Sequence, residues 1–245
     1  MKDAVLLAGG MGTRLESVSG GKPKPMVEVA GRPFIEYVLD VVRGAGCLRV
    51  VMAVSHRWQV MREHFGDAYK GLELCWSVET NPLGTGGAAR FAFNSFRLER
   101  AFVVNADTLF LVDLRALEHR HWEERAQVTI ALKHLEDVSR FGSVELDNDD
   151  RVVAFREKGR HGPGLINGGI YVIERSVFDV RDFPLKFSIE YDLLQVETDR
   201  LRPIGMRSSG YFVDIGIPAE LERAQRELKK GRMPPGSSAG TTNGG

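Results

Sequence analysis

Near the start of the chain, residues 4–15 read Ala4-Val5-Leu6-Leu7-Ala8-Gly9-Gly10-Met11-Gly12-Thr13-Arg14-Leu15. A short apolar run that leads into a glycine-dense turn is typical of the first strand of an α/β sheet followed by a phosphate-binding loop. Glycine lets the backbone approach a ligand closely, so that successive N–H groups can point at phosphate oxygens. Residues 22–26 follow as Lys22-Pro23-Lys24-Pro25-Met26, and Arg14, Lys22 and Lys24 add positive charge beside these donors. The loop is therefore predicted to bind an anion.

Two better-known glycine motifs do not fit this loop. A dinucleotide-binding fingerprint, G-x-G-x-x-G, needs its last glycine where Leu15 stands when the count starts from Gly10. A P-loop needs a hydroxyl residue after its Gly-Lys pair, but Pro23 follows Gly21-Lys22, and Glu16 occupies the place of its first glycine. A tight strand-to-helix turn without a ligand is the alternative that stays open.

Composition favours a globular protein with a small-molecule partner. The 33 Lys and Arg residues balance the 33 Asp and Glu residues, so neither a nucleic acid nor a membrane surface is an expected partner. A chain of 245 residues is long enough for one α/β domain with a large core. No apolar run approaches the roughly 20 residues that span a bilayer. The two cysteines, Cys47 and Cys75, stand in apolar contexts typical of reduced packing residues, and we expect a cytoplasmic protein.

Strand and helix patterns alternate along the chain. Apolar runs predict strands over 49–54, 72–78, 102–104 and 128–132, and helical spacing predicts helices over 33–45 and 58–65, one that ends at Phe93, and one over 113–125. This alternation indicates a Rossmann-like α/β fold, with a mostly parallel mixed sheet covered by helices on both faces. In such sheets ligands bind at the carboxyl ends of the strands, where the first loop lies.

Two further features follow strands of this sheet. Residues 79–88 read Glu79-Thr80-Asn81-Pro82-Leu83-Gly84-Thr85-Gly86-Gly87-Ala88, and glycines before a helix N-terminus suit either close approach to a ligand or a simple helix-start turn. Asp107 follows the strand 102–104 and places a carboxylate at the sheet edge where the phosphate loops lie. Mg²⁺ is usually held by one or two carboxylates together with substrate phosphates, so Asp107 is a candidate metal ligand. A turn or helix-capping role is the alternative.

Shorter strands follow from residue 141. Residues 142–146 and 152–155 flank an acidic turn and predict a β-hairpin added to the central sheet. Ser188 is expected to cap a helix that has acids in its first turn. Residues 210–216, Gly-Tyr-Phe-Val-Asp-Ile-Gly, predict a strand that ends in a second aspartate, Asp214. The residues 231–245 have little to bury, so we expect a single domain over 1–230 and a flexible tail.

Taken in order, these segments resemble the sugar-1-phosphate nucleotidyltransferases, whose pattern is L-A-G-G-x-G-T-R-L followed by x-P-K-P-M. The match runs from Gly9 to Met26 without a gap, and it departs at Ser17-Val18-Ser19, where many members carry Pro-Leu-Thr. Residues 82–88 and 210–216 resemble the family segments P-L-G-T-x-G-A and G-Y-x-x-D-I-G. The resemblance covers residues 1 to about 230 and implies the nucleotidyltransferase fold, which is GT-A-like.

The resemblance also implies a role for each matched residue. Residues expected to bind the nucleotide are Leu7, Ala8, Gly9, Gly10, Gly12, Thr13, Glu79, Pro82, Gly84, Thr85, Gly86 and Asn105. Residues expected to bind the sugar phosphate are Glu157, Lys158, Asn167, Gly168 and Glu190, while Asp107 and Asp214 would hold Mg²⁺ and Arg14 and Lys24 would be catalytic. Residues 1–110 would form a nucleotide-binding half and 111–230 a sugar-binding half. The Glu79 carboxylate would accept hydrogen bonds from N1–H and N2–H₂ of guanine.

The implied reaction transfers GMP from GTP to a sugar 1-phosphate and releases pyrophosphate. The short chain and the segments 34–37, 84–87 and 166–171 most resemble heptose-1-phosphate guanylyltransferases of cell-surface polysaccharide synthesis, with D-glycero-alpha-D-manno-heptose 1-phosphate as the sugar. A mannose-1-phosphate guanylyltransferase and a hexose-1-phosphate uridylyl- or thymidylyltransferase are alternatives. A non-catalytic nucleotide-sugar-binding regulator is an alternative of a different class, because fold alone does not determine function. Assembly into a homo-oligomer stays open.

Overall fold

The computed structural model describes residues 1–10 and 21–229 of the chain. Three residues expected in the active site, Gly12, Thr13 and Arg14, and the expected tail 231–245 lie outside the described residues. Within the described part of the chain, no helix is both long enough and apolar enough to cross a membrane.

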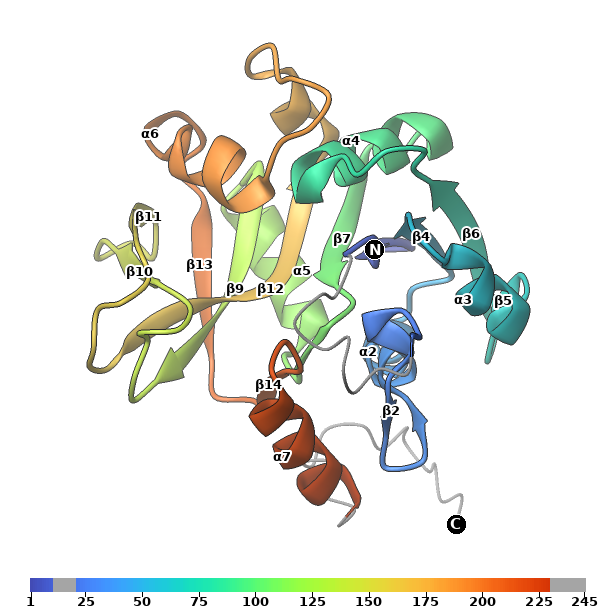
Figure 1. Cartoon of the computed structure of the whole chain (residues 1–245). Coiled ribbons are helices and arrows are strands. Elements are labelled where there is room, and N and C mark those ends of the chain that lie inside the picture. Colours follow the sequence, from blue (N-terminus) through green and yellow to red (C-terminus); the bar gives the residue numbers. More distant parts are fainter. Residues whose placement is uncertain (11–20, 230–245) are drawn as a thin grey trace, which may run out of the picture.

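Ten of the described strands form one mixed sheet (Figure 1). Its main path runs through β11 (Val152–Arg156), β10 (Ser143–Leu146), β12 (Gly164–Glu174), β7 (Arg100–Asn105), β1 (Asp3–Leu7), β4 (Arg49–Val54), β6 (Leu72–Val78) and β5 (Ala68–Tyr69), and β9 (Val128–Leu135) connects β12 to β13 (Ile204–Ser208). The central strands β7, β1, β4 and β6 are parallel, and Val5 lies opposite Val51 on one side and Val103 on the other. β12 is antiparallel to β7, β9 and β10, so it joins the parallel strands to the β10–β11 hairpin.

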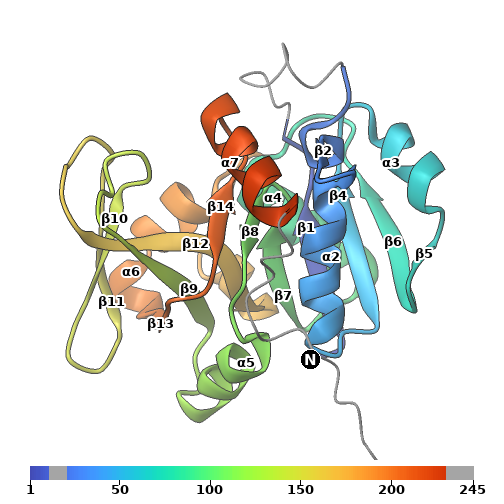
Figure 2. The same ribbon diagram turned by 90° about the horizontal axis from the view of Figure 1, so that it is seen from below.

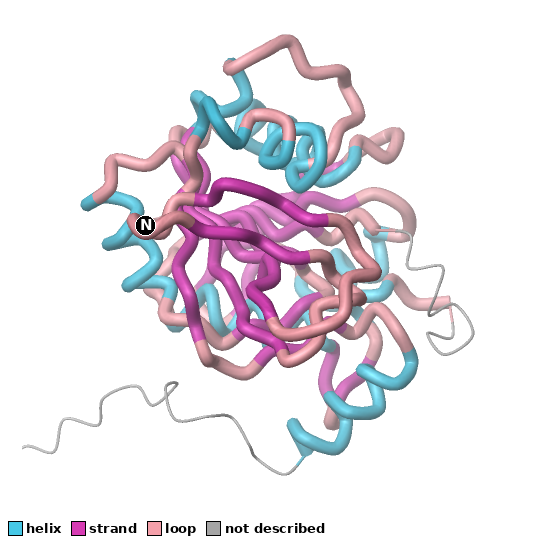
Figure 3. Tube along the Cα trace, turned by 90° about the vertical axis from the view of Figure 1, so that its left-hand side faces the viewer, coloured by secondary structure: helices cyan, strands magenta, loops and turns pink. Residues whose placement is uncertain are grey.

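Helices cover both faces of the sheet. They are α2 (Phe34–Gly44), α3 (Trp58–Phe65), α4 (Gly84–Phe96), α5 (Leu114–Glu123), α6 (Thr198–Leu201) and α7 (Pro218–Lys229). In Figure 1, α4 lies above the sheet and α2 and α7 lie below it, and Figure 3 shows the strands as the layer between them. Successive residues of a strand face opposite sides. Accordingly, Leu6 belongs to the same core cluster as Phe34 of α2, whereas Val5 belongs to the cluster of Phe93 of α4.

The predicted α/β fold is confirmed, and several elements have the predicted bounds. β4, β6 and α3 begin and end at the expected residues, and the expected hairpin is β10–β11. Ser188 caps the helix that follows, since its Oγ accepts the backbone N–H groups of Glu190 and Tyr191, but that helix, Ile189–Gln195, is a π-helix. Cys47 is buried and Cys75 is partly buried, and both are free thiols. Burial raises the pKa of Cys47 to about 12, as expected for a packing residue.

Two short ribbons lie beside the large sheet (Figure 2). β8 (Thr108–Phe110) pairs antiparallel with β14 (Phe212–Asp214), and β2 (Glu28–Val29) pairs with β3 (Arg32–Pro33). The register of the first ribbon sets Asp214 opposite Thr108. The start of β8, which directly follows Asp107, therefore lies beside the end of β14, which is Asp214, although the two segments are far apart in the sequence.

Residues 83–87, which are the N-cap and first turn of α4, pack against the segment 185–190. The carbonyl oxygen of Phe187 accepts the backbone N–H groups of both Gly86 and Gly87, at 2.9 and 3.2 Å, and Phe187 N–H donates to the carbonyl of Leu83 at 3.0 Å. The Cα of Gly87 faces the carbonyl oxygen of Leu185 so closely that a Cβ would overlap it. A backbone carbonyl cannot move aside as a flexible side chain can, so this packing requires glycine.

We expect Gly87→Ala to destabilise the protein by about 1–3 kcal/mol, because the added methyl group must push two backbone segments apart. Gly44→Ala is the matched control, since Gly44 is also helical and a Cβ there meets no atom within 4 Å. Alanine in place of glycine favours a helix by up to about 1 kcal/mol, so the control should be neutral or stabilising. Urea unfolding monitored by circular dichroism measures both changes, and equal stability of the two variants would disprove the steric argument.

Candidate active site

A cavity of about 520 Å³ lies where the parallel strands meet the hairpin side of the sheet. β7, β12, β14, the start of β8, the residues after β11 and the helix 189–195 all contribute to its lining. The predicted site residues in this lining are Asn105, Glu157, Lys158, Asn167, Gly168, Glu190 and Asp214. Asn105 was expected on the nucleotide side, and the structure places it in the same cavity as the residues expected on the sugar side.

Lys24 lies between the two predicted metal-binding acids. Its Nζ is 2.6 Å from Asp107 Oδ2 and 3.6 Å from Asp214 Oδ1. The β8–β14 ribbon brings these acids together, and the backbone N–H of Ile215 donates to the carbonyl of Asp107 at 3.1 Å. The N–H of Gly216 donates to Asp214 Oδ1 at 2.8 Å, and a Cβ on Gly216 would lie 3.2 Å from Lys24 Nζ. Gly216, which was not predicted as a site residue, thus allows the close approach of the lysine.

The electrostatics of this cluster favour an added cation. Burial raises the pKa of Asp214, and repulsion from the Asp107 carboxylate raises it further, while Lys24 and the Gly216 N–H oppose both effects. No group of three or more His, Cys, Asp or Glu side chains that could hold a metal occurs among residues 1–10 and 21–229. Two carboxylates alone fit an Mg²⁺ ion that takes its remaining ligands from substrate phosphates and water. The donor set therefore suits a metal that binds together with a substrate.

The nucleotide side is built around Gly9 and Glu79, at the ends of β1 and β6. Ser55 Oγ donates to the carbonyl of Gly9 at 2.6 Å, and a Cβ on Gly9 would lie 3.2 Å from Glu79 Oε1. Glu79 Oε2 accepts the N–H of Leu83 at 2.9 Å, and the residue is only 8% exposed. Burial raises the pKa of Glu79, and the Leu83 N–H opposes this shift. The acid is therefore a buried group beside the first loop, unlike an ordinary exposed glutamate at a strand end.

Several backbone groups on this side already have partners within the protein. Leu7 accepts the N–H of Ala106 at 3.2 Å, and Ala8 donates to Ala53 at 2.8 Å. The N–H of Gly86 is bonded to Phe187, and the ring of Phe187 covers the Cα of Gly86. The close approach predicted for this glycine is thus made by the chain itself, and its contact with a nucleotide stays a prediction.

On the sugar side, a hydrogen-bonded group surrounds the Glu190 carboxylate. Tyr171 OH donates to Glu190 Oε1 at 3.1 Å and accepts from Asn167 Nδ2 at 2.8 Å. Thr85 Oγ1 and Ser188 Oγ each donate to Glu190 Oε2 at 2.8 Å. Tyr171 is fully buried, and burial followed by the Glu190 charge keeps its pKa well above the ordinary value. Tyr171 and the contact from Thr85 were not predicted, because only the fold brings these three segments together.

Glu157 and Lys158 lie at the exposed edge of the cavity. Asn105 lies deeper, and its Oδ1 is buried without a hydrogen-bond partner among the described residues. A Cβ on Gly169 would lie 2.8 Å from Asn105 Nδ2, so the glycine allows the amide to pack closely. An unpaired buried acceptor costs free energy unless a ligand or water completes it. Asn105 therefore suits contact with a bound molecule.

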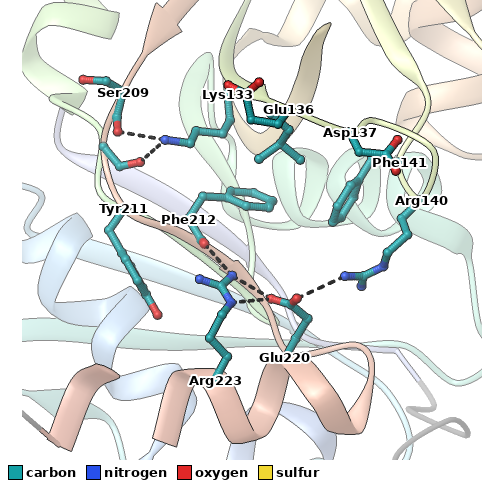
Figure 4. A pocket seen from close by; sticks show the side chains of 12 residues that line it. Lys133, Glu136, Asp137, Arg140, Phe141, Ser209, Tyr211, Phe212, Glu220 and Arg223 are labelled. Atoms are coloured by element: carbon teal, nitrogen blue, oxygen red, sulfur yellow. Dashed lines mark hydrogen bonds and ion pairs between the residues drawn. The ribbon is translucent and has the colours of Figure 1, made fainter. Parts of the chain in front are cut away.

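A second hollow of about 450 Å³ shares Phe141 and Phe212 with this cavity (Figure 4). Lys133 Nζ donates to the carbonyls of Ser209 and Gly210, both at 2.8 Å, and burial lowers the pKa of this lysine. Arg223 donates to the carbonyl of Phe212 at 3.0 Å and also pairs with Glu220. These contacts hold the residues that lead into β14, so they support the strand that ends at Asp214.

Comparisons with known proteins identify the family of this chain. The model of the nucleotidyl transferase family matches residues 3–231. The D-glycero-alpha-D-manno-heptose 1-phosphate guanylyltransferase of Aneurinibacillus thermoaerophilus is 40% identical over 227 residues, which cover 93% of this chain and 98% of that protein. The mannose-1-phosphate guanylyltransferase of Mycobacterium tuberculosis is 37% identical over 95% of this chain and 66% of its own length.

Among solved structures, HddC from Yersinia pseudotuberculosis complexed with GMP-PN has a TM-score of 0.82 and 32% identity, over 94% of this chain and 100% of that one. The fold is a mostly parallel mixed α/β sheet, and the acid–lysine cluster suits a cation that binds together with phosphates. The chain belongs to the nucleotidyl transferase family, which confirms the family resemblance seen in the sequence.

We expect Asp214→Asn to raise the melting temperature of the ligand-free protein at pH 7. A folded-state pKa above the unfolded one means that this carboxyl stabilises the fold when protonated and that its contribution is lost as the pH rises through the folded-state pKa. The asparagine side chain is neutral at both pH values, so the variant does not lose this stability as the pH rises. Thermal unfolding with EDTA at pH 4 and pH 7 checks this, and the gain should be smaller at pH 4.

Asp107→Asn is the control, because it removes the 2.6 Å contact with Lys24 and should give no gain at pH 7. A lower melting temperature for Asp214→Asn than for Asp107→Asn would contradict the argument.

Proposed function

We propose that this protein transfers GMP from GTP to D-glycero-alpha-D-manno-heptose 1-phosphate and releases pyrophosphate, in the cytoplasm and for cell-surface polysaccharide synthesis. The observation that carries the proposal is the similarity to the Aneurinibacillus guanylyltransferase over 98% of its length. The acid–lysine cluster beside a polar cavity supports it, because a nucleotidyl transfer needs charge neutralisation on one side and a sugar site on the other.

In this proposal the sugar 1-phosphate attacks the α-phosphorus without a general base, since a phosphate is already ionised at neutral pH. The chain must align the two substrates and neutralise charge. Asp107 and Asp214 would hold Mg²⁺, which supplies positive charge to the phosphates when it is bound. Lys24 would stabilise charge at the α-phosphate, and Arg14 with the glycine loop would hold the pyrophosphate.

The remaining residues divide between the substrates. Those proposed for the nucleotide are Leu7, Ala8, Gly9, Gly10, Gly12, Thr13, Glu79, Pro82, Gly84, the backbone of Thr85, Gly86 and Asn105. Glu79 suits guanine because a carboxylate only accepts, and guanine offers N1–H and N2–H₂ as donors. Lys158 would orient the sugar phosphate, and Glu157, Asn167, Gly168 and Glu190 would surround the sugar. We further propose that residues 1–110 serve the nucleotide and 111–230 the sugar within a single domain.

Mannose 1-phosphate is the second candidate sugar, and the Mycobacterium relative is the observation in its favour. That relative is matched over 66% of its length, whereas the heptose relative is matched over 98%, so we place the heptose phosphate first. A non-catalytic regulator would not need Lys24, Asp107 and Asp214 in contact, which favours an enzyme.

A substrate panel tests the proposal. Pyrophosphate release is measured for four nucleoside triphosphates against heptose, mannose and glucose 1-phosphates, with and without Mg²⁺. GTP with the manno-configured heptose phosphate should have the highest kcat/KM, and removal of Mg²⁺ should abolish turnover. Faster turnover with UTP or dTTP would reject the role of Glu79 in guanine recognition. No turnover with any substrate pair would reject the proposal that the protein is a nucleotidyltransferase.

Lys24→Ala should lower kcat by about 10²- to 10³-fold, the effect typical of removing one preorganised group that stabilises transition-state charge. Lys70→Ala is the matched control, because Lys70 is exposed and pairs with Asp40 away from the cavity. Steady-state kinetics at saturating substrates give both values. Near-normal turnover of the Lys24 variant would remove this lysine from the mechanism.

A further inference from the structure

We propose that Thr85 is a positioning residue for the sugar: its hydroxyl orients Glu190 in the cavity and does not serve the nucleotide. The inference rests on the proposed function, in that it takes the cavity as the sugar site. It assigns the Thr85 side chain to the opposite substrate from the one that the sequence resemblance implied.

The Thr85 hydroxyl is fully used in hydrogen bonds within the protein. A threonine hydroxyl has one proton to donate. Thr85 Oγ1 donates it to Glu190 Oε2 at 2.8 Å and accepts the N–H of Ile189 at 2.9 Å. A hydrogen bond from a hydroxyl to a carboxylate is among the stronger ones. The hydroxyl therefore cannot donate to a nucleotide phosphate or base without releasing Glu190.

The first turn of α4, which carries Thr85, is also fixed by packing. The N–H groups of Gly86 and Gly87 both donate to the Phe187 carbonyl, and Arg90 donates to the carbonyls of Phe183 and Pro184 at 3.1 and 2.8 Å. The start of α4 is thus bonded to the segment that precedes Glu190. Thr85 and Glu190 are held in place relative to each other by backbone contacts as well as by their own hydrogen bond.

Glu190 is the group through which Thr85 would act on the sugar. Its carboxylate lines the cavity and accepts three hydroxyl groups, those of Thr85, Ser188 and Tyr171. A carboxylate has about four acceptor positions, so one is left for a substrate hydroxyl. Thr85 and Ser188 share Oε2, so the open acceptor position lies on Oε1 beside the bond from Tyr171. Loss of the Thr85 hydroxyl removes one of the three bonds that fix the carboxylate plane, so that the open position on Oε1 is held less firmly toward the substrate. Loss of the Thr85 hydroxyl should therefore weaken binding of the sugar 1-phosphate.

The test compares Thr85→Val, which has nearly the same shape without the hydroxyl, with Thr85→Ser, which keeps it. Both are assayed with the substrate pair that the panel finds best. Thr85→Val should raise the KM for the sugar 1-phosphate by about 10-fold or more, as expected for the loss of a hydrogen bond to a charged group, and leave the KM for the nucleotide within about 2-fold. Thr85→Ser should restore the wild-type KM for the sugar.

A double-mutant cycle with Glu190→Gln separates positioning from a general loss of structure. If Thr85 acts through Glu190, the double variant should have the same KM for the sugar as Glu190→Gln alone. Equal increases in both KM values for Thr85→Val, or fully additive effects in the cycle, would overturn the inference.

Calorimetric titration with the sugar 1-phosphate repeats the comparison without turnover. If the wild-type protein turns over no substrate pair, the proposed function is rejected, and the titration alone then tests the role of Thr85. That role is overturned if the sugar phosphate binds Thr85→Val as tightly as it binds the wild type, or if it binds neither protein.

Discussion

The antiparallel pairing of β8 with β14 is the constraint on which the candidate site depends. It sets Asp214 opposite Thr108, beside Asp107, and so brings two like charges together. This arrangement costs stability, because burial and, after it, repulsion from Asp107 raise the pKa of Asp214, and Lys24 offsets part of the cost by contacting both acids. A fold selected only for stability would separate these carboxylates. Their proximity makes sense where phosphates and a divalent cation are to be bound.

A second constraint couples the two sides of the cavity. The start of α4, residues 83–87, is bonded to the segment 185–190, while the nearby Glu79 accepts the N–H of Leu83. The residues proposed for the base and those proposed for the sugar are therefore parts of one bonded assembly. Gly84, Gly86 and Gly87 owe their identity to this packing, because a Cβ at each would collide with residues 185–187. Packing alone therefore explains why glycine stands at these three positions, without contact to a bound ligand.

Much of the fold could be predicted from the sequence because its signals are local. Apolar runs and punctuating glycines located β4, β6 and α3, and a Ser cap located the start of the helix at Ile189. Pairing between distant segments could not be predicted in this way. The position of Asp107 beside Asp214 came from the family resemblance alone, and the structure supplies its physical cause. Tyr171 escaped prediction because a tyrosine inside an apolar strand has the pattern of a core residue, and only the contact with Glu190 distinguishes it.

The same distinction explains why the sequence indicates the reaction more firmly than the sugar. Charge neutralisation at phosphates needs a few cations and acids in a recognisable motif, and Lys24, Asp107 and Asp214 are the residues proposed to supply it. Sugars differ in the direction of single hydroxyl groups, and a site discriminates among them by leaving its own polar groups unpaired with the wrong one. On the proposed assignment of the cavity, the group left for that purpose is one acceptor position on Glu190. Its direction is set by Thr85, Ser188 and Tyr171 through their hydrogen bonds to the carboxylate. On the proposed assignment, selectivity for the sugar would depend on the residues that hold Glu190 in place, and these come from distant segments about which a sequence motif carries the least information.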